Sequence, residues 1–153
     1  MSYAGFWKRF AAYLIDAVIL WVVNLFLLVP FLGMLGLGFI ESSMMDGDPS
    51  EGMIAAIIGA YFGSMMMIFL AGWLYFAIME SSNKQGTLGK MALGIVVTDM
   101  NGSRISFGRA TGRYFGKILS GLTFTIGYII AGFTEKKQAL HDMIAGCLVV
   151  NKQ

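Results

Sequence analysis

An acidic residue inside a long apolar stretch is the strongest chemical signal in this sequence. Asp16 is the single charged residue between Phe10 and about Ile40. If this stretch is a helix that enters a bilayer near Phe10, the carboxylate lies about 9 Å along it. A carboxylate at the centre of a membrane helix costs roughly 2.5–3.5 kcal/mol, and less nearer the interface. Asp16 therefore needs a partner. It is either an ion or proton site or part of a structural polar cluster, satisfied by a neighbouring helix end or by basic residues of the middle segment.

A stripe of polar residues runs along the same predicted helix. At 100° per residue its members fall within an arc of about 80°; they are Arg9, Tyr13, Asp16 and Asn24. Arg9 lies two helical turns before Asp16, so we expect its guanidinium to be the counter-charge of this carboxylate. Because polar groups are costly against lipid, we expect the stripe to face the protein interior or a wet cavity.

A second charged stripe recurs every four residues later in the chain. Arg109, Arg113 and Lys117 would share one face of a helix. Two interpretations are open. The stripe lies at the surface and meets anionic lipid headgroups, at roughly 1 kcal/mol per basic residue, or it lines a funnel for an anion or a charged substrate.

Metal and catalytic chemistry find little support in the residue types. The chain holds one histidine, His141, and one cysteine, Cys147, which are too few for a zinc site of these two residue types. Met65, Met66 and Met67 are consecutive, so on a helix they would point to different faces. This pattern is typical of methionines that fill apolar space. No nucleophile and base stand at a recognisable spacing. We therefore expect no metal, no cofactor and no catalytic residue, and a protein that is not an enzyme.

Membrane helices are the elements that must position these residues. Hydrophobic residues make up 57% of the 153 and charged residues 13%, against about 45–50% and about 25% in soluble domains. This composition excludes a basic nucleic-acid-binding domain, a disordered chain and a disulfide scaffold. We predict a mainly α, polytopic membrane protein with full transmembrane helices at about 10–33 and about 53–79. A third, re-entrant or broken hydrophobic segment is expected within about 107–133.

Charge asymmetry predicts the orientation of these segments. The loop 41–52 carries acidic residues and neither Lys nor Arg, whereas basic residues precede the first helix and follow the second. By the positive-inside rule, we expect both termini in the cytoplasm and the chain in the plasma (inner) membrane. A single crossing by the apolar residues 118–133 would place the tail, 134–153, outside. We therefore favour a re-entrant hairpin that breaks near 121–124.

The predicted cytoplasmic segment, 81–106, carries signals for a helix start and a small sheet. Residues 86–90 resemble a phosphate loop only faintly, and we interpret them as a helix start with Thr87 as the N-cap. Residues 94–106 read as a β-hairpin around the turn dipeptide Asn101-Gly102. Residues 147–150 are a candidate third strand, which an otherwise marginal hairpin would need.

Three separated motifs resemble those of the RDD family of small membrane proteins, which is named for one arginine and two aspartates. The opening residues 5–16 are similar to the first-helix motif of that family, with Arg9 at the helix start and Asp16 within it. Residues 86–90, followed by 94–97, are similar to its central motif. Residues 139–142, with Gly146 and 149–150 behind them, are similar to its closing motif and supply the second aspartate, Asp142.

The resemblance implies a polytopic membrane domain with a suspected transport role, and some members are linked to cation/proton antiport. It also implies that Arg9, Asp16 and Asp142 belong together, and His141 could then tune a proton site. We therefore expect cation/proton exchange through this Arg/Asp/Asp cluster. The alternative is a non-transporting accessory or scaffold protein in which the cluster is structural. The expected partners are the lipid bilayer and either a second copy or another membrane subunit, and no nucleic acid.

Overall fold

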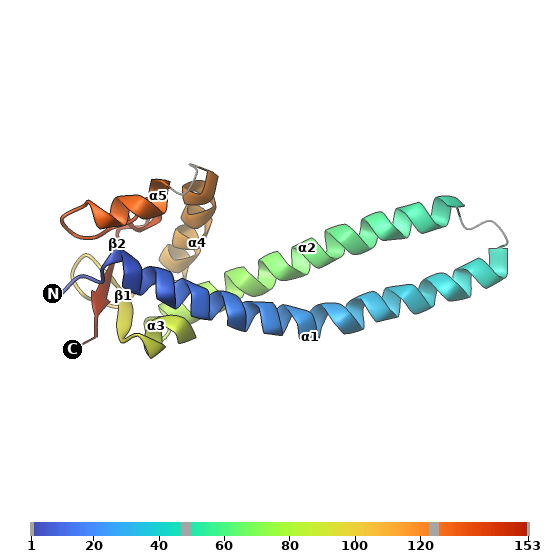
Figure 1. Cartoon of the computed structure of the whole chain (residues 1–153), viewed down its shortest axis with the longest axis horizontal. Helices are drawn as coiled ribbons and strands as arrows, with labels where there is room; N and C mark the ends of the chain where they lie inside the picture. The colour runs from blue at the N-terminus through green and yellow to red at the C-terminus, as the bar shows by residue number, and fades with distance from the viewer. Residues whose placement is uncertain (1, 47–49, 123–125, 153) are drawn as a thin grey trace. The chain divides into compact units, whose positions relative to one another are not determined.

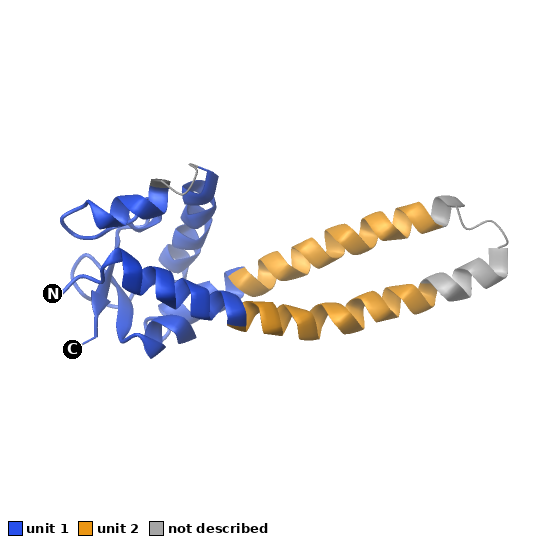
Figure 2. Ribbon diagram, in the orientation of Figure 1, with its two compact units in different colours: residues 1–18, 73–153 blue, residues 19–72 orange. Residues whose placement is uncertain are grey.

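The computed structural model of the chain describes residues 2–46, 50–122 and 126–152, with side chains for all of these except 39–46, 50–52 and 126. Contacts divide the chain into two compact units (Figure 2). One consists of Met1–Val18 with Trp73–Gln153, and the other of Ile19–Gly72. The elements are α1 (Phe6–Asp46), α2 (Ser50–Ser81), α3 (Leu88–Ala92), β1 (Ile95–Asp99), α4 (Phe107–Leu122), α5 (Ile126–Ile129), the 3-10 helix η1 (Ile130–Gly132), α6 (Leu140–Ile144) and β2 (Cys147–Asn151).

Two helices are long and apolar enough to cross a membrane. They comprise Phe6–Gly38 of α1 and Met53–Ser81 of α2, drawn from blue to cyan and in green in Figure 1. The fold is mainly helical, with two candidate membrane helices and a small sheet, which confirms the predicted mainly α class. Their orientation in a membrane remains a prediction.

The first helix is longer than the sequence predicted. We expected it to end near residue 33, where a proline and several glycines weaken a helix, but α1 continues through Pro30 to Asp46. Proline is tolerated in helices of this kind, because the single backbone group that it frees is readily satisfied. The predicted acidic loop 41–52 is correspondingly shorter, since 41–46 and 50–52 are helical; residues 47–49 lie outside the described part.

The unit Ile19–Gly72 consists of parts of α1 and α2. Within it, the ring of Phe31 fills the space beside Gly63, where an added Cβ would lie 3.0 Å from the ring. Large apolar side chains such as Trp21, Phe26 and Met34 are exposed. Exposed apolar side chains along both helices are expected of surfaces that face lipid rather than water.

The other unit contains the sheet and ties the two ends of the chain together. Strands β1 and β2 pair antiparallel, with Val97 opposite Val149. The N-terminus extends the sheet: Tyr3 forms a bridge with Val150, and the amide of Ala4 donates to the carbonyl of Val149 over 2.9 Å. The side chains of Val97 and Val149 are fully buried in the core of this unit. The two ends of the chain therefore lie side by side in this unit.

The predicted β-hairpin at 94–106 is wrong in its second half. The turn exists, since Oδ1 of Asp99 accepts from the amides of Asn101 (2.9 Å) and Ser103 (2.8 Å). Residues 104–106 do not return as a strand, because Ser106 already accepts the first hydrogen bond of α4, from the amide of Ala110. The partner of β1 is therefore β2, and the sheet has two strands instead of three.

The third hydrophobic segment folds back on itself, as a hairpin would. Helix α4 ends at Leu122, and the chain returns through α5 and η1. The return is packed closely: an added Cβ on Gly127 would lie 2.8 Å from the side chain of Ser120, and the hydroxyl of Tyr128 donates to the carbonyl of Lys117 over 3.1 Å. The residues of the predicted break that follow Leu122 lie outside the described part. Whether this hairpin enters a bilayer remains a prediction.

Candidate functional site

Asp16 is buried in α1 and is held by neutral donors. Its Oδ1 accepts from the hydroxyl of Tyr75 and the amide of Gly89, both at 2.8 Å, and its Oδ2 accepts from the hydroxyl of Thr87 at 2.5 Å. Leu88 donates its amide to the Tyr75 oxygen over 3.0 Å. Asp16 therefore caps the start of α3 from another helix, which is a structural use of the carboxylate.

This arrangement corrects two details of the sequence interpretation. The helix start after residue 86 is confirmed, but the Thr87 side chain does not cap its own helix and donates to Asp16 instead. The expected pair of Arg9 with Asp16 is wrong: none of the ion pairs found in the described part of the chain includes Asp16. Three donors already satisfy the carboxylate, so it does not need a charged partner.

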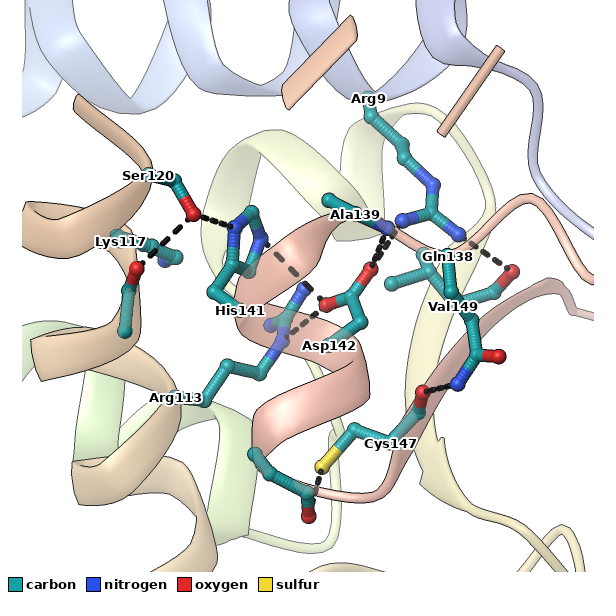
Figure 3. Close-up of polar contacts among 12 residues, drawn as sticks. Arg9, Arg113, Lys117, Ser120, Gln138, Ala139, His141, Asp142, Cys147 and Val149 are labelled. Carbon is teal, nitrogen blue, oxygen red and sulfur yellow. Dashed lines mark hydrogen bonds and ion pairs between the residues drawn. The ribbon is translucent and has the colours of Figure 1, made fainter. Parts of the chain in front are cut away.

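Arg9 instead pairs with Asp142. Its Nη1 donates to Oδ2 of Asp142, and its Nε donates to the carbonyl of Ala4 over 3.0 Å. Figure 3 shows Arg9 reaching from α1 to the start of α6, where Asp142 also accepts from the amide of Ala139 at 3.1 Å. The first and last motifs of the chain therefore meet in one buried ion pair.

A second guanidinium completes the surroundings of Asp142. Arg113, on α4, donates from Nε to Oδ1 of Asp142 over 2.7 Å and from Nη1 to Oε2 of Glu80 over 2.6 Å. All three side chains are almost completely buried. Burial opposes the ionisation of Asp142, but the guanidiniums of Arg113 and Arg9 hold the pKa of this carboxyl well below its usual range. Burial would lower the pKa of Arg113, but the two carboxylates raise it.

Glu80 lies at the end of α2 and gathers three cations. Besides Arg113, it pairs with Lys90 from α3, and the Nζ of Lys117 lies 3.6 Å from its Oε1. The same ammonium lies 3.6 Å from the centre of the Phe76 ring, at cation–π distance. Burial lowers the pKa of Lys90, and it lowers the pKa of Lys117 to about 7 in spite of Glu80. Lys117 therefore gains or loses its proton close to neutral pH.

His141 is a neutral member of the cluster. Its Nδ1 lies 3.2 Å from the hydroxyl of Ser120, its Nε2 lies 3.5 Å from Oδ1 of Asp142, and its ring packs on Tyr128 with 5.1 Å between the centres (Figure 3 shows the first two contacts). Burial lowers the pKa of His141 to about 3. The imidazole is uncharged at neutral pH and fills a polar position beside the aspartate.

The structure places the remaining predicted site residues in different surroundings. Tyr13 is half exposed, and Asn24 belongs to the other unit, where its Oδ1 is buried with no hydrogen-bond partner in the described part of the chain. The basic stripe on α4 is not a uniform surface stripe. The side chain of Arg109 is 53% exposed and lies 4.0 Å from Asp99, whereas that of Arg113 is 2% exposed, so Arg113 is not available to lipid headgroups.

Sequence reasoning missed Glu80, Lys90 and Tyr75. Glu80 had a usable signal, because it follows the charge-free apolar stretch 53–79 and must find a cation when buried. Lys90 is the last residue of the central motif 86–90, but nothing in the sequence indicated that it pairs with Glu80. The role of Tyr75 could not be predicted, because an aromatic residue in an apolar helix is ordinary.

A cavity of about 530 Å³ adjoins the cluster, and residues of the same unit line it throughout. One part of its wall is basic, formed by Arg9, Lys90, Arg113 and Lys117, with Asp16 and His141 beside them. The other part is apolar and aromatic and includes Phe10, Tyr13 and Tyr128. Its size lies within the range of about 300–1,000 Å³ typical of sites for small organic ligands.

Comparison with known proteins identifies the family. The RDD family profile matches residues 3–146. The chain belongs to the RDD family. It is 38% identical over 149 residues to the uncharacterized protein YxaI of Bacillus subtilis, covering 97% of each chain. It is 34% identical over 158 residues to the uncharacterized membrane protein YteJ of the same organism, covering 99% of this chain and 83% of the relative. No solved structure matches it.

The predicted membership of the RDD family is thereby confirmed. Of the residues that the sequence analysis assigned to the family pattern, Arg9 and Asp142 form an ion pair, whereas Asp16 holds α3 through neutral donors. Together with its two long apolar helices, family membership makes this chain an RDD family membrane protein.

Proposed function

We propose that this RDD protein has a transport-related role at the plasma membrane, in which it exchanges protons against a charged solute at the buried cluster. The observation that carries the proposal is the position of Lys117. Its ammonium lies 3.6 Å from Glu80 and lines the cavity of about 530 Å³. A largely buried basic group that adjoins a solute-sized cavity can couple the gain or loss of a proton to binding.

The geometry favours Lys117 over the two aspartates as the exchanging group. Asp142 contacts two guanidiniums and a backbone amide, and Asp16 contacts three neutral donors. Displacing those donors would leave buried groups unsatisfied. Lys117 has weaker pairing among the described contacts, because it shares the carboxylate of Glu80 with two other cations.

Proteoliposomes with an internal pH-sensitive dye test the proposal. We expect the wild-type chain to move protons above the rate of empty vesicles when a gradient of a charged solute is applied, and Lys117→Met to lose that movement. Arg109→Met is the matched control, because it removes an exposed charge from the same helix. Absence of wild-type flux with Na⁺, K⁺ and a panel of anions would contradict the proposal, as would full flux in Lys117→Met.

A second candidate is an accessory or scaffold role without transport. It is favoured by one observation, the complete pairing of Asp16, Glu80 and Asp142 with donors of the protein itself. Under this alternative, Asp142→Asn lowers the melting temperature in detergent, and neither form shows flux. Flux in the wild-type protein would decide against it.

The proposal also includes the orientation of the two termini and a partner subunit. We infer that both termini lie in the cytoplasm, because the basic flanks of the two apolar helices lie at one end of each and the termini are paired through Tyr3 and Val150. Two spanning helices enclose little space, so we expect a second copy or another membrane subunit to complete a path. Reporter fusions at each terminus and the mass of the detergent-solubilised particle test these two points.

A further inference from the structure

We propose that the cavity binds an amphiphilic monoanion, with its acidic head at Lys117 and its apolar chain along the aromatic wall. The inference names a ligand for the site of the proposed function and rests on that function for its choice of cavity. Binding can be measured without flux, however, so the two proposals can fail separately.

The charges of the cavity favour an anion over a cation. Four basic side chains line it, namely Arg9, Lys90, Arg113 and Lys117. The carboxylates that contact this set are Glu80 and Asp142, and both are buried behind it, at 1% and 0% exposure. Asp16 also lines the cavity, but three donors occupy its oxygens. A cation would therefore meet ammonium and guanidinium groups, whereas an anion would complete their pairing.

Lys117 is the basic group best placed to receive the acidic head. Arg9 and Arg113 both donate to Asp142, and Lys90 pairs with Glu80 at hydrogen-bond distance. The Nζ of Lys117 lies farther from Glu80, at 3.6 Å, and its side chain keeps 18% exposure. A second carboxylate or phosphodiester oxygen could approach this ammonium without breaking any hydrogen bond of Asp142. With Lys117 protonated, the four cations outnumber the three carboxylates of Asp16, Glu80 and Asp142 by one positive charge, which matches one negative charge on the ligand.

The apolar part of the lining indicates that the ligand also has an apolar part. It includes Phe10 and Tyr13 from the first turns of α1, with Tyr128 and Ile129 from α5. Phe10, Tyr13 and Ile129 are each about half exposed. Phe10 and Tyr13 belong to the first turns of the candidate membrane helix Phe6–Gly38. A basic wall beside exposed apolar side chains at a helix end fits a molecule whose head is charged and whose chain is apolar.

Two sources could supply this chemistry: a free fatty acid, or the headgroup region of an anionic phospholipid. The test uses the full-length chain in a neutral maltoside detergent. Calorimetric titration with decanoate measures the binding. Acetate serves as the head without the chain, and dodecyltrimethylammonium as an amphiphile of the opposite charge. Competition by phosphatidylglycerol, with phosphatidylcholine as the neutral lipid, then distinguishes the two sources.

We expect decanoate to bind, and acetate and the cationic amphiphile to bind at least about tenfold more weakly. Lys117→Met should weaken decanoate binding by about tenfold or more, which is the loss of one charge-assisted contact. Arg109→Met should leave it unchanged. Competition by phosphatidylglycerol alone assigns the site to membrane lipid, and no competition assigns it to the free acid; either result supports an amphiphilic monoanion.

Three results would overturn the inference: no decanoate binding by the wild-type chain, equal binding of the cationic amphiphile, or unchanged binding in a folded Lys117→Met protein. If Lys117→Met does not fold, Lys117→Arg and Phe10→Ala decide. The first should retain binding, because it keeps the charge. The second should weaken decanoate binding and leave acetate unaffected, and unchanged decanoate binding in Phe10→Ala would count against the apolar wall.

Discussion

Arg113 donates from Nε to the carboxylate of Asp142 over 2.7 Å, and both side chains are buried. The same guanidinium contacts Glu80, so its removal would leave two buried carboxylates short of a counter-charge. We predict that Arg113→Met destabilises the fold by about 3–5 kcal/mol, as expected for one partner of a buried ion pair. Thermal unfolding in detergent measures the change.

Arg109→Met is the control for this prediction. Arg109 lies one turn earlier on α4, and its side chain is 53% exposed, so the same substitution should change the stability by less than about 0.5 kcal/mol. Similar melting temperatures for the two variants would show that the buried network contributes little.

A double-mutant cycle should separate the two aspartates. Arg9 contacts Asp142 but not Asp16. We predict a coupling energy of about 1–3 kcal/mol between Arg9→Met and Asp142→Asn, since the residues share an ion pair. Arg9→Met and Asp16→Asn should instead be additive within about 0.5 kcal/mol. The free energies come from reversible unfolding in mixed micelles, and strong coupling of Arg9 with Asp16 would contradict the pairing described here.

Gly89→Ala and Gly112→Ala should change the stability in opposite directions, because only Gly89 is closely packed, beside Asp16. A Cβ on Gly89 would lie 2.2 Å from the carbonyl oxygen of Ala12 and 3.0 Å from the Asp16 carboxyl, so Gly89→Ala should destabilise the protein by about 1–3 kcal/mol. A Cβ on Gly112, in the middle of α4, would meet nothing within 4 Å. Gly112→Ala should therefore stabilise the helix by about 0.5–1 kcal/mol. Melting temperatures that move in the same direction for both would refute this packing.

Acid should destabilise the fold through His141. Its pKa is about 3 in the folded chain and about 6.5 when exposed, so the unfolded state binds more protons between these values. The stabilising contribution is complete above pH 6.5 and is lost as the pH falls toward 3, at about 1 kcal/mol per pH unit. The charged groups that act on the ring are Asp142, Arg113, Lys117 and Glu80.

Exposed carboxyls titrate mainly below the range from pH 6.5 to 4.5, and comparison with His141→Gln separates the effect of His141 from that of Lys117, whose pKa is about 7. We predict that the wild-type protein loses stability across this range and that His141→Gln loses clearly less. Parallel stability curves for the two proteins, measured by denaturant unfolding in micelles at each pH, would exclude His141 as the cause.

The sequence predicted the membrane helices and the meeting of the first and last motifs, but not the network that joins them. Hydropathy and motif spacing are local properties, so α1, α2 and the helix start at Leu88 could be predicted from them. The partner of a charged residue is a tertiary property. Arg9 was assigned to Asp16 because both lie on one helix face, and to Asp142 only through the family resemblance. The structure pairs it with Asp142, which lies 133 positions away in the chain. The missing strand at 104–106 has a similar cause: the predicted turn forms, but α4 begins directly after it, and Ser106 accepts the first backbone hydrogen bond of that helix.

The antiparallel contact of the first residues with β2 affects the order of assembly in the cell. Ala4 and Tyr3 obtain their strand partners only after Val149 and Val150 have left the ribosome, and Arg9 meets Asp142 at the same late stage. Both apolar helices are synthesised well before then. The contacts that join the first residues to the last ones therefore form only at the end of synthesis, and a shortened product that lacks β2 could not make the strand contacts of Tyr3 and Ala4.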